Sequence, residues 1–359
     1  MSKQISQPTR FIHRQAWRTQ AYAQSYKHDL PIETGQLHEI AAGVYLLRLP
    51  MPFALDHINV YLLEDGAGFT LIDCGLNTSK TREIWTQVLA QAGPLKRIIV
   101  THHHPDHIGA AGWLAEKYDV PVFITAVEYE VVGRYSDPDR DIVQERSPLW
   151  LEHGLPAERV DDLVKNIPNY TRLVSPLAAE RVHLLDTRAP IQIGARRWTP
   201  IIGRGHSPEH LSLLDKEAGL LIGGDQVLPE ITPNIAVWPG SDQNPLFSYF
   251  ETLEPFLAIG QEVLHLPSHH QPMYGTDYRA QQIYSHHEER LGALWSACTV
   301  PVSAYDLMPV LFGRMLADPE MGFGMGEIIA HLYYLESQGL LQSELINGVR
   351  HYKQQMPAN

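Results

Sequence analysis

Apolar positions predict an alternation of strands and helices through the first third of the chain. Some of them alternate with polar residues, as in a half-buried strand, and others recur at helical spacing. The patterns predict strands at 43–49, 59–65, 69–75, 96–100 and 120–125 and helices at 78–93 and 108–118. The Gly-rich segment 64–68 predicts a hairpin turn between the second and third strands.

The segment between residues 126 and 180 has a different character. Its short helical patterns are separated by Pro, Gly and Asp, which predicts a helical insertion. The insertion could cover a cleft as a lid, with Tyr135, Trp150 and Tyr170 lining an apolar pocket, or these aromatics could form its own core. Strands then resume at 181–185, 190–194, 198–203, 210–215, 220–225 and 262–267, with a helix at about 246–259. Strands that alternate with helices indicate a layered α/β fold.

The same patterns divide the chain into three parts. We expect an N-terminal arm over residues 1–36, a central domain over 37–275 and a C-terminal domain over 276–359. The C-terminal part is mostly helical, with a small hairpin expected near 346–353. A length of 359 residues fits about two domains.

Composition excludes several classes of protein. A hydrophobic content of 44% is enough for a real core, so a wholly disordered chain is excluded. The formal net charge of −13 argues against binding along a nucleic-acid backbone, which needs clustered Lys and Arg. With only Cys74 and Cys298, a disulfide scaffold and a Cys-rich zinc site are also excluded. The 19 histidines are the unusual feature.

The N-terminal segment gives information about the cellular compartment of the protein. It has five cationic residues and no acidic residue before Asp29, and it lacks the apolar region of a secretory signal. We expect an arm that lies on the domain, with an organellar transit peptide as the alternative. No run approaches the roughly 20 apolar residues of a membrane span. We therefore expect a cytoplasmic protein, or one of an organellar matrix if the arm is a transit peptide.

The strongest chemical signal is the segment 101–107, Thr-His-His-His-Pro-Asp-His, where a strand ends and a helix begins. Residues at i and i+2 at a strand end point the same way, so His102 and His104 can share one metal ion. Asp106 is expected near the helix N-cap and His107 in the first helical turn. Both would face a second metal position next to the first. The spacing thus supplies two ligand sets, and a solvated His-rich turn is the alternative.

Further ligand-capable side chains follow other predicted strands in order. His206 follows the strand at 198–203, Asp225 ends the strand at 220–225, and His269 follows the strand at 262–267. Asp73 is a similar case within 69–75. Each lies at the carboxyl end of an apolar strand, often beside Gly or Pro, which let the backbone turn sharply.

These residues together resemble the metallo-β-lactamase fold superfamily, because all five of its motif regions occur in order across about residues 40–275. The resemblance implies a four-layer αββα sandwich. It also implies that His102, His104 and His206 hold one metal ion, that Asp106, His107 and His269 hold a second, and that Asp225 bridges them. Asp73 and His210 would orient ligands without binding metal. Ser268 and His270 depart from the family, which often has Gly on either side of its last motif histidine.

The site so implied suggests a hydrolytic mechanism. Two divalent ions, zinc first and iron or manganese as alternatives, suit imidazole and carboxylate ligands. A water bridging them would lose a proton near neutral pH and act as the nucleophile. Asp106 is the candidate for orienting that water or accepting its proton.

Other histidines have less specific interpretations. His103 should point away from the ligands, and only one of His265, His269 and His270 is expected to reach the metal ions. His286 and His287 are expected on a helix surface.

The substrate class is predicted from the C-terminal part. Segments 304–313, 326–341 and 346–353 resemble the winged-helix-like appendage of one branch of the superfamily, which includes an endoribonuclease. Residues 276–359 contain nine acidic and five basic side chains, a net charge of −4, whereas a nucleic-acid-binding winged helix should be basic on one face. We therefore favour hydrolysis of a small ester, thioester or lactone, with packing or a homodimer contact for the C-terminal domain. A phosphodiesterase or ribonuclease is the alternative, and an iron-dependent redox enzyme ranks third.

Overall fold

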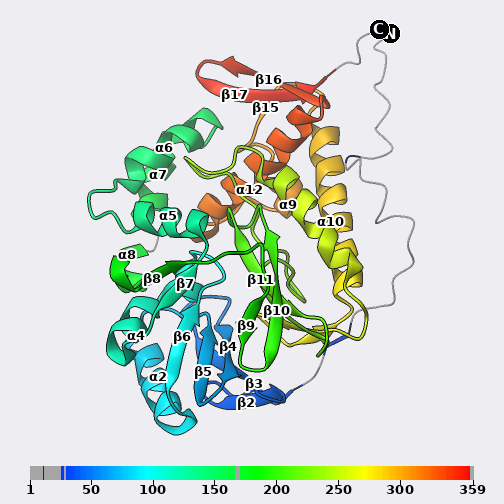
Figure 1. Ribbon diagram of the computed structural model, residues 1–359. Coiled ribbons are helices and arrows are strands. Elements are labelled where there is room, and N and C mark those ends of the chain that lie inside the picture. Colours follow the sequence, from blue (N-terminus) through cyan, green and yellow to red (C-terminus); the bar gives the residue numbers. More distant parts are fainter. Residues whose placement is uncertain (1–10, 12–25, 28–29, 166–169, 356–359) are drawn as a thin grey trace.

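The computed structural model describes residues 11, 26–27, 30–165 and 170–355. Figure 1 shows two sheets at the centre of the molecule, with helices on the outer sides and a C-terminal hairpin at one end. The sequence-predicted alternation of strands and helices is therefore observed.

The first sheet contains seven of the described strands, in the order β2-β3-β4-β5-β6-β7-β8. Their bounds are β2 Leu37–Ala41, β3 Val44–Pro50, β4 His57–Asp65, β5 Gly68–Ile72, β6 Leu95–Ile99, β7 Val122–Ile124 and β8 Val182–Leu184. The pairs from β2 to β5 are antiparallel, and the predicted hairpin joins β4 to β5. From β5 onward the pairs are parallel, so β5 and β6 end at the same edge.

The second sheet also contains seven described strands, in the order β1-β14-β13-β12-β11-β10-β9. Their bounds are β1 Tyr26–Lys27, β9 Ile191–Ile193, β10 Arg196–Gly203, β11 His210–Asp215, β12 Leu220–Gly224, β13 Leu264–Pro267 and β14 Met273–Tyr274. Only β12 and β13 pair in parallel, so the loops that follow these two strands also meet at one edge.

Three hydrophobic clusters define the layers. One lies between the sheets and includes Leu46 and Ile72 of the first and Leu213 and Leu266 of the second. Another packs the outer face of the first sheet against α2 and α4, and the largest packs the second sheet against C-terminal helices. The helices concerned are α2 Ser79–Ala92, α4 Ala111–Tyr118, α9 Pro245–Leu253, α10 Thr276–Ala297 and α12 Asp318–Ser337. The 3-10 helix η2 Glu254–Ala258 follows α9.

The expected helical insertion is present between β7 and β8. Its elements are α5 Ala126–Tyr135, α6 Ile142–Glu152, α7 Ala157–Lys165, α8 Tyr170–Leu173 and η1 Ala179–Arg181. Of the two interpretations of Trp150, a pocket lining or a core residue, the structure supports a core residue. Its side chain is fully buried in the cluster that contains α12. Trp150 therefore joins the insertion to the C-terminal helices.

The C-terminal part combines helices with a three-stranded sheet in the order β15-β17-β16. Its remaining elements are α11 Met308–Phe312, β15 Val302–Ser303, β16 Leu341–Ile346 and β17 Val349–Gln354. The predicted hairpin exists, but its first strand begins five residues earlier than expected. The turn is Asn347-Gly348, both with positive φ, which is the turn chemistry that favours a tight hairpin.

Two described pieces of the N-terminal segment lie against the rest of the protein. Strand β1 pairs with β14. The Phe11 backbone N–H donates to Glu288 Oε1 at 2.7 Å, and the ring packs near Trp295. The remaining residues of the predicted arm up to 25 lie outside the described part. No helix in the described part of the chain is both long and apolar enough to cross a membrane.

Candidate metal centre

Five loops from both sheets bring the predicted site residues together. Asp73 follows β5, the 101–107 segment follows β6, His206 lies between β10 and β11, and Asp225 and His269 follow β12 and β13. The parallel pairs β5–β6 and β12–β13 place these loops at shared edges. A backbone hydrogen bond from Leu211 N to Thr101 O, at 2.9 Å, joins the two sheets at this point.

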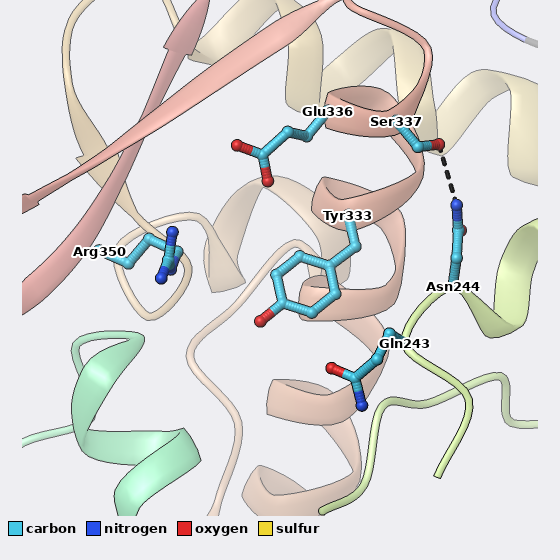
Figure 2. A pocket seen from close by; sticks show the side chains of 6 residues that line it. All are labelled: Gln243, Asn244, Tyr333, Glu336, Ser337 and Arg350. Atoms are coloured by element: carbon cyan, nitrogen blue, oxygen red, sulfur yellow. Dashed lines mark hydrogen bonds between the residues drawn. The ribbon is translucent and has the colours of Figure 1, made fainter.

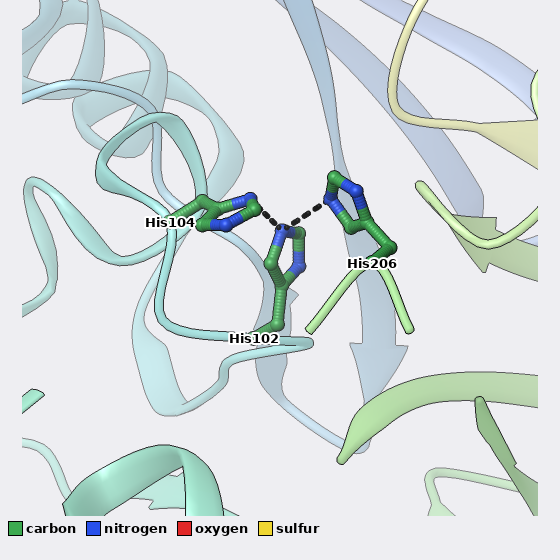
Figure 3. A group of neighbouring side chains, drawn as sticks. All are labelled: His102, His104 and His206. Carbon is green, nitrogen blue, oxygen red and sulfur yellow. Dashed lines mark hydrogen bonds between the residues drawn. The ribbon is translucent and has the colours of Figure 1, made fainter. Parts of the chain in front are cut away.

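The first group of ligand atoms contains three imidazoles (Figure 3). His102 Nε2 lies 2.9 Å from His104 Nδ1 and 3.3 Å from His206 Nε2. The i, i+2 spacing of His102 and His104 therefore does place both rings on one side, as predicted.

The second group contains Asp106, His107 and His269. Asp106 Oδ2 lies 3.4 Å from His269 Nε2 and 3.6 Å from His107 Nε2. Asp106 lies in the first turn of the short helix α3 Pro105–Ile108, two residues after its N-cap His104, so the expected place near the N-cap is confirmed. From this position its carboxylate faces both rings.

Asp225 lies between the two groups. Its Oδ2 is 3.4 Å from His107 Nε2 and 3.5 Å from His206 Nε2, and its Oδ1 is 3.5 Å from His269 Nε2. These distances fit the bridging position that the family resemblance implies for Asp225.

Backbone and carboxylate acceptors orient three of the imidazoles. His206 Nδ1 donates to Asn234 O at 3.1 Å, and His269 Nδ1 donates to His57 O at 2.8 Å. His107 Nδ1 donates to Asp73 Oδ2 at 2.7 Å. These acceptors hold each ring by its Nδ1, and in each case Nε2 faces the centre.

Asp73 and His210 hold the loops without facing the centre. Asp73 accepts hydrogen bonds from Thr101 N at 2.8 Å and Thr101 Oγ1 at 2.7 Å, besides that from His107. His210 Nε2 accepts from Asp225 N at 2.9 Å. These contacts match the orienting roles expected for both residues.

Contacts from β3 and β4 hold the loop of His269, and the sequence did not reveal them. Asn59 Nδ2 and Arg48 Nη2 both donate to His270 O at 2.9 Å, and Tyr61 Oη donates to Pro267 O at 2.7 Å. Each partner lies more than 200 residues away in the sequence, so no local spacing could have indicated it.

The electrostatics of the centre favour metal ligands. Burial, together with the neighbouring rings, lowers the pKa of His102 and His104 well below the usual value, so both stay neutral. Burial opposes ionisation of Asp225, but His269 and His107 outweigh it and lower its pKa. Burial opposes protonation of His107 and His269, but Asp225 and Asp106 outweigh it, raising the pKa of His107 above its usual value and that of His269 to about 10. A bound cation would displace these protons, because metal binding needs neutral imidazoles and ionised carboxylates.

The donor set fits two transition-metal ions. His107 Nε2 and Asp225 Oδ1 are buried and have no hydrogen-bond partner in the described part of the chain. An unpaired buried polar atom is costly, and a cation that accepts both lone pairs would remove that cost. Five imidazoles and two carboxylates suit zinc, iron or manganese.

The remaining candidate residues lie elsewhere. His265 is buried and interacts with Thr276 Oγ1, and His270 points to Glu230, so only His269 of the three reaches the centre. Cys74 is fully buried. The expectation that His287 lies on a helix surface is wrong, because it is buried and contacts His331.

A separate polar pocket lies between the loop before α9 and the C-terminal domain (Figure 2). Its volume is about 390 Å³. It is lined by Gln243, Asn244, Tyr333, Glu336, Ser337 and Arg350. Arg350 already pairs with Glu152, and none of the lining residues belongs to the metal centre.

Comparison with known families decides the classification. A family model described as the metallo-beta-lactamase superfamily matches residues 54–269. The chain belongs to the metallo-beta-lactamase superfamily. A second model, described as the metallo-beta-lactamase-like C-terminal domain, matches residues 291–355. The family and its C-terminal domain were both predicted from sequence.

Relatives of this superfamily member cover most of its length. A protein of Bacillus subtilis named probable metallo-hydrolase YqjP is 23% identical over 84% of this chain and 94% of its own. A solved beta-lactamase domain protein from Burkholderia ambifaria is 36% identical, with a TM-score of 0.84 over 91% of this chain and 96% of its own. A metallo-beta-lactamase family protein from Thermus thermophilus is 27% identical, with a TM-score of 0.75 over 88% of this chain and 100% of its own.

Proposed function

We propose that this superfamily member is a dinuclear metal-dependent hydrolase of a small ester, thioester or lactone. The observation that carries the proposal is the convergence of seven donor side chains in two groups, with Asp225 between them. The relative named a metallo-hydrolase supports the reaction class. The choice of zinc over iron or manganese is part of the proposal.

The metal ions would supply Lewis acidity, which lowers the pKa of water and polarises the bond to be cleaved. The chain supplies the framework for this chemistry. His102, His104 and His206 would hold one ion, and Asp106, His107 and His269 the other, with Asp225 shared. Acceptors at Asn234, His57 and Asp73 keep the ring nitrogens aimed at the centre.

Asp106 is the proposed residue for orienting the attacking water or accepting its proton. Its side chain is 20% exposed, against 8% for Asp225, so it is the more accessible of the two carboxylates. A carboxylate that lines both the metal centre and the solvent can take up a proton and release it.

The charge and packing of the C-terminal domain favour a small substrate over nucleic acid. Its residues from 276 onward have a net charge of −4, and α10 and α12 contribute their apolar faces to the core on the second sheet. A winged-helix-like role in substrate binding would need an exposed basic face. We propose instead that this domain supports the catalytic domain.

A paired turnover assay tests the proposal. One arm offers acyl-thioesters and lactones, the other single-stranded RNA, each with metal-analysed protein. We expect thioester or lactone hydrolysis that His102→Ala abolishes, while His183→Ala, at an exposed position of β8, leaves it intact. RNA cleavage that His102→Ala abolishes would overturn the substrate class and favour the phosphodiesterase alternative.

A further inference from the structure

We propose that Glu128, in helix α5 of the insertion, is a positioning residue for the first metal-binding group. The inference rests on the proposed function, because it concerns the histidines that hold one of its metal ions. Glu128 is fully buried, yet it belongs to neither group of ligand atoms. Its carboxylate instead connects the two loops that carry His102, His104 and His206.

One oxygen of Glu128 binds the residue between two ligands. Glu128 Oε2 accepts a hydrogen bond from His103 N at 2.9 Å and interacts with His103 Nδ1 at 2.6 Å. His103 is thereby held through both its backbone and its ring. Since His102 and His104 flank it directly, fixing His103 fixes the directions in which both neighbouring side chains leave the backbone.

The other oxygen of Glu128 reaches the next motif loop. Glu128 Oε1 accepts from Glu209 N at 2.8 Å, three residues after His206 and one before His210. A single carboxylate thus spans the loop after β6 and the loop between β10 and β11. His102 and His206 come from different sheets, and their Nε2 atoms lie only 3.3 Å apart.

Two further side chains of the insertion hold His103. Tyr170 Oη donates to His103 O at 2.8 Å, and the Tyr135 ring lies against the His103 ring with centroids 5.4 Å apart. Side chains from α5 and α8 therefore contact His103 on several sides. The insertion thus acts directly on the loop that carries His102 and His104.

The position suits a permanent negative charge. Glu128 lies in the first turn of α5, where the helix dipole favours an anion, and Thr125 caps that turn. Burial alone would disfavour the ionised form, but the charge of His103 and the hydrogen bonds from His103 and Glu209 lower the pKa of Glu128 to about 2. The carboxylate remains ionised, so all its acceptor sites are available to the two loops.

Glu128→Gln tests the role, because the amide keeps the size of the side chain and replaces one acceptor oxygen by a donor. Glu128→Asp keeps the charge but shortens the reach. Glu130→Gln, at an exposed position of the same helix, is the matched control. Each variant is titrated with Zn²⁺ against a chelating indicator, and Co²⁺-loaded protein is examined by visible absorption.

We expect Glu128→Gln to weaken one of two Zn²⁺ binding steps by about 10–100-fold and to alter the Co²⁺ spectrum, as loss of a residue that orients ligands does. Glu128→Asp should lie between this variant and the control. It also serves as the test if Glu128→Gln does not fold. A lower melting temperature with both binding steps within about twofold of the control would overturn the inference.

The outcome is independent of the substrate. If the wild type binds two ions but hydrolyses none of the esters, thioesters or lactones, the proposed function fails while the Zn²⁺ titration still tests Glu128. If hydrolysis is observed and all variants bind Zn²⁺ equally, the inference about Glu128 fails alone.

Discussion

At the scale of single residues, two positions next to the metal centre have left-handed backbone without being glycine. Asp73 has φ of 61° and His270 has φ of 68°. Such conformations are costly for residues with a Cβ and persist where surrounding contacts hold them. At Asp73 three hydrogen bonds do so, and at His270 the donors Arg48 and Asn59 do. His270 stands where the family often has Gly, and its positive φ explains that preference.

Asp73→Asn should weaken Zn²⁺ binding to the second group by about 10–100-fold. Asn tolerates the left-handed backbone, so the variant removes mainly the charge and one acceptor that orient His107. The measurement is a Zn²⁺ titration against a chelator, with metal content as a second readout. Asp119→Asn is the control, since it changes a left-handed Asp at the end of α4. Equal affinities for both variants would contradict the orienting role.

Away from the metal centre, a buried pair of histidines, His287 of α10 and His331 of α12, lies between these two helices. His331 Nδ1 donates to Glu327 O at 2.8 Å, so its Nε2 is free to accept from His287 Nδ1 at 3.1 Å. His287 Nε2 is then a buried acceptor without a partner in the described part of the chain. Burial, opposed by the Glu327 hydrogen bond and reinforced by Arg290 and His286, lowers the pKa of His331 to about 3.

This pair predicts a loss of stability in mild acid. The unfolded chain binds a proton at His331 with a pKa near 6.5, whereas the folded chain does so only near 3. The free energy of unfolding should therefore fall as pH drops from 6.5 toward 3, by about 1.4 kcal/mol per pH unit for each such histidine. Urea unfolding at several pH values measures the slope. His331→Asn should make it shallower, and an unchanged slope would argue against a neutral buried His331.

At the scale of elements, the helical insertion is joined to the C-terminal domain by α6. Trp150 packs against Gly322 of α12, His153 Nε2 interacts with Tyr352 Oη at 3.0 Å, and Glu152 pairs with Arg350. One end of the insertion thus holds the metal-binding loop through Glu128, and the other packs on the C-terminal domain.

Trp150→Ala should lower the free energy of unfolding by about 3–5 kcal/mol, the usual cost of removing a fully buried large side chain. Leu151 is the next residue of α6 and is 39% exposed, so Leu151→Ala should cost less than about 1 kcal/mol. Chemical denaturation of both variants measures the difference. Losses of similar size would show that Trp150 is not a core residue.

At the scale of the whole molecule, the largest core is shared by the catalytic and C-terminal parts. It runs from Leu221 of the second sheet and Val263, which precedes β13, through Leu291 and Ile328 to Tyr352 of the terminal hairpin. A common core makes the two parts depend on each other for burial of apolar surface.

Calorimetry should therefore show one cooperative unfolding transition for the full chain. Because α10 and α12 share a core with the second sheet, the C-terminal part cannot unfold without exposing that sheet. Two well-separated transitions would refute this dependence.

Metal removal should lower the melting temperature and abolish hydrolysis, and Zn²⁺ should restore both. Ligands that bind only the folded state stabilise it by mass action, and without metal the centre leaves His107 Nε2 and Asp225 Oδ1 unpaired. Differential scanning with and without a chelator checks the shift. An identical melting temperature with fully depleted metal would contradict the role of this centre in stability.

Much of the metal centre was predictable because its signals are local. His102, His104, Asp106 and His107 lie within six residues, and the other donors each follow an apolar strand. Strand direction and the i, i+2 rule then suffice to bring them to one edge. The long-range partners Arg48, Asn59 and Glu128 have no such signal, since each touches a loop that lies far away in the sequence or in another sheet.

Periodicity and motif spacing are properties of short segments, so the residue order alone established the α/β alternation, the family and the order of the donor residues. Burial depends on which faces meet after folding. Only folding therefore placed Trp150 in the shared core, buried His287 against His331, and brought the Glu128 carboxylate between two ligand loops. Local apolar and polar patterns do not specify which surfaces will meet, so these contacts could not be predicted from the sequence alone.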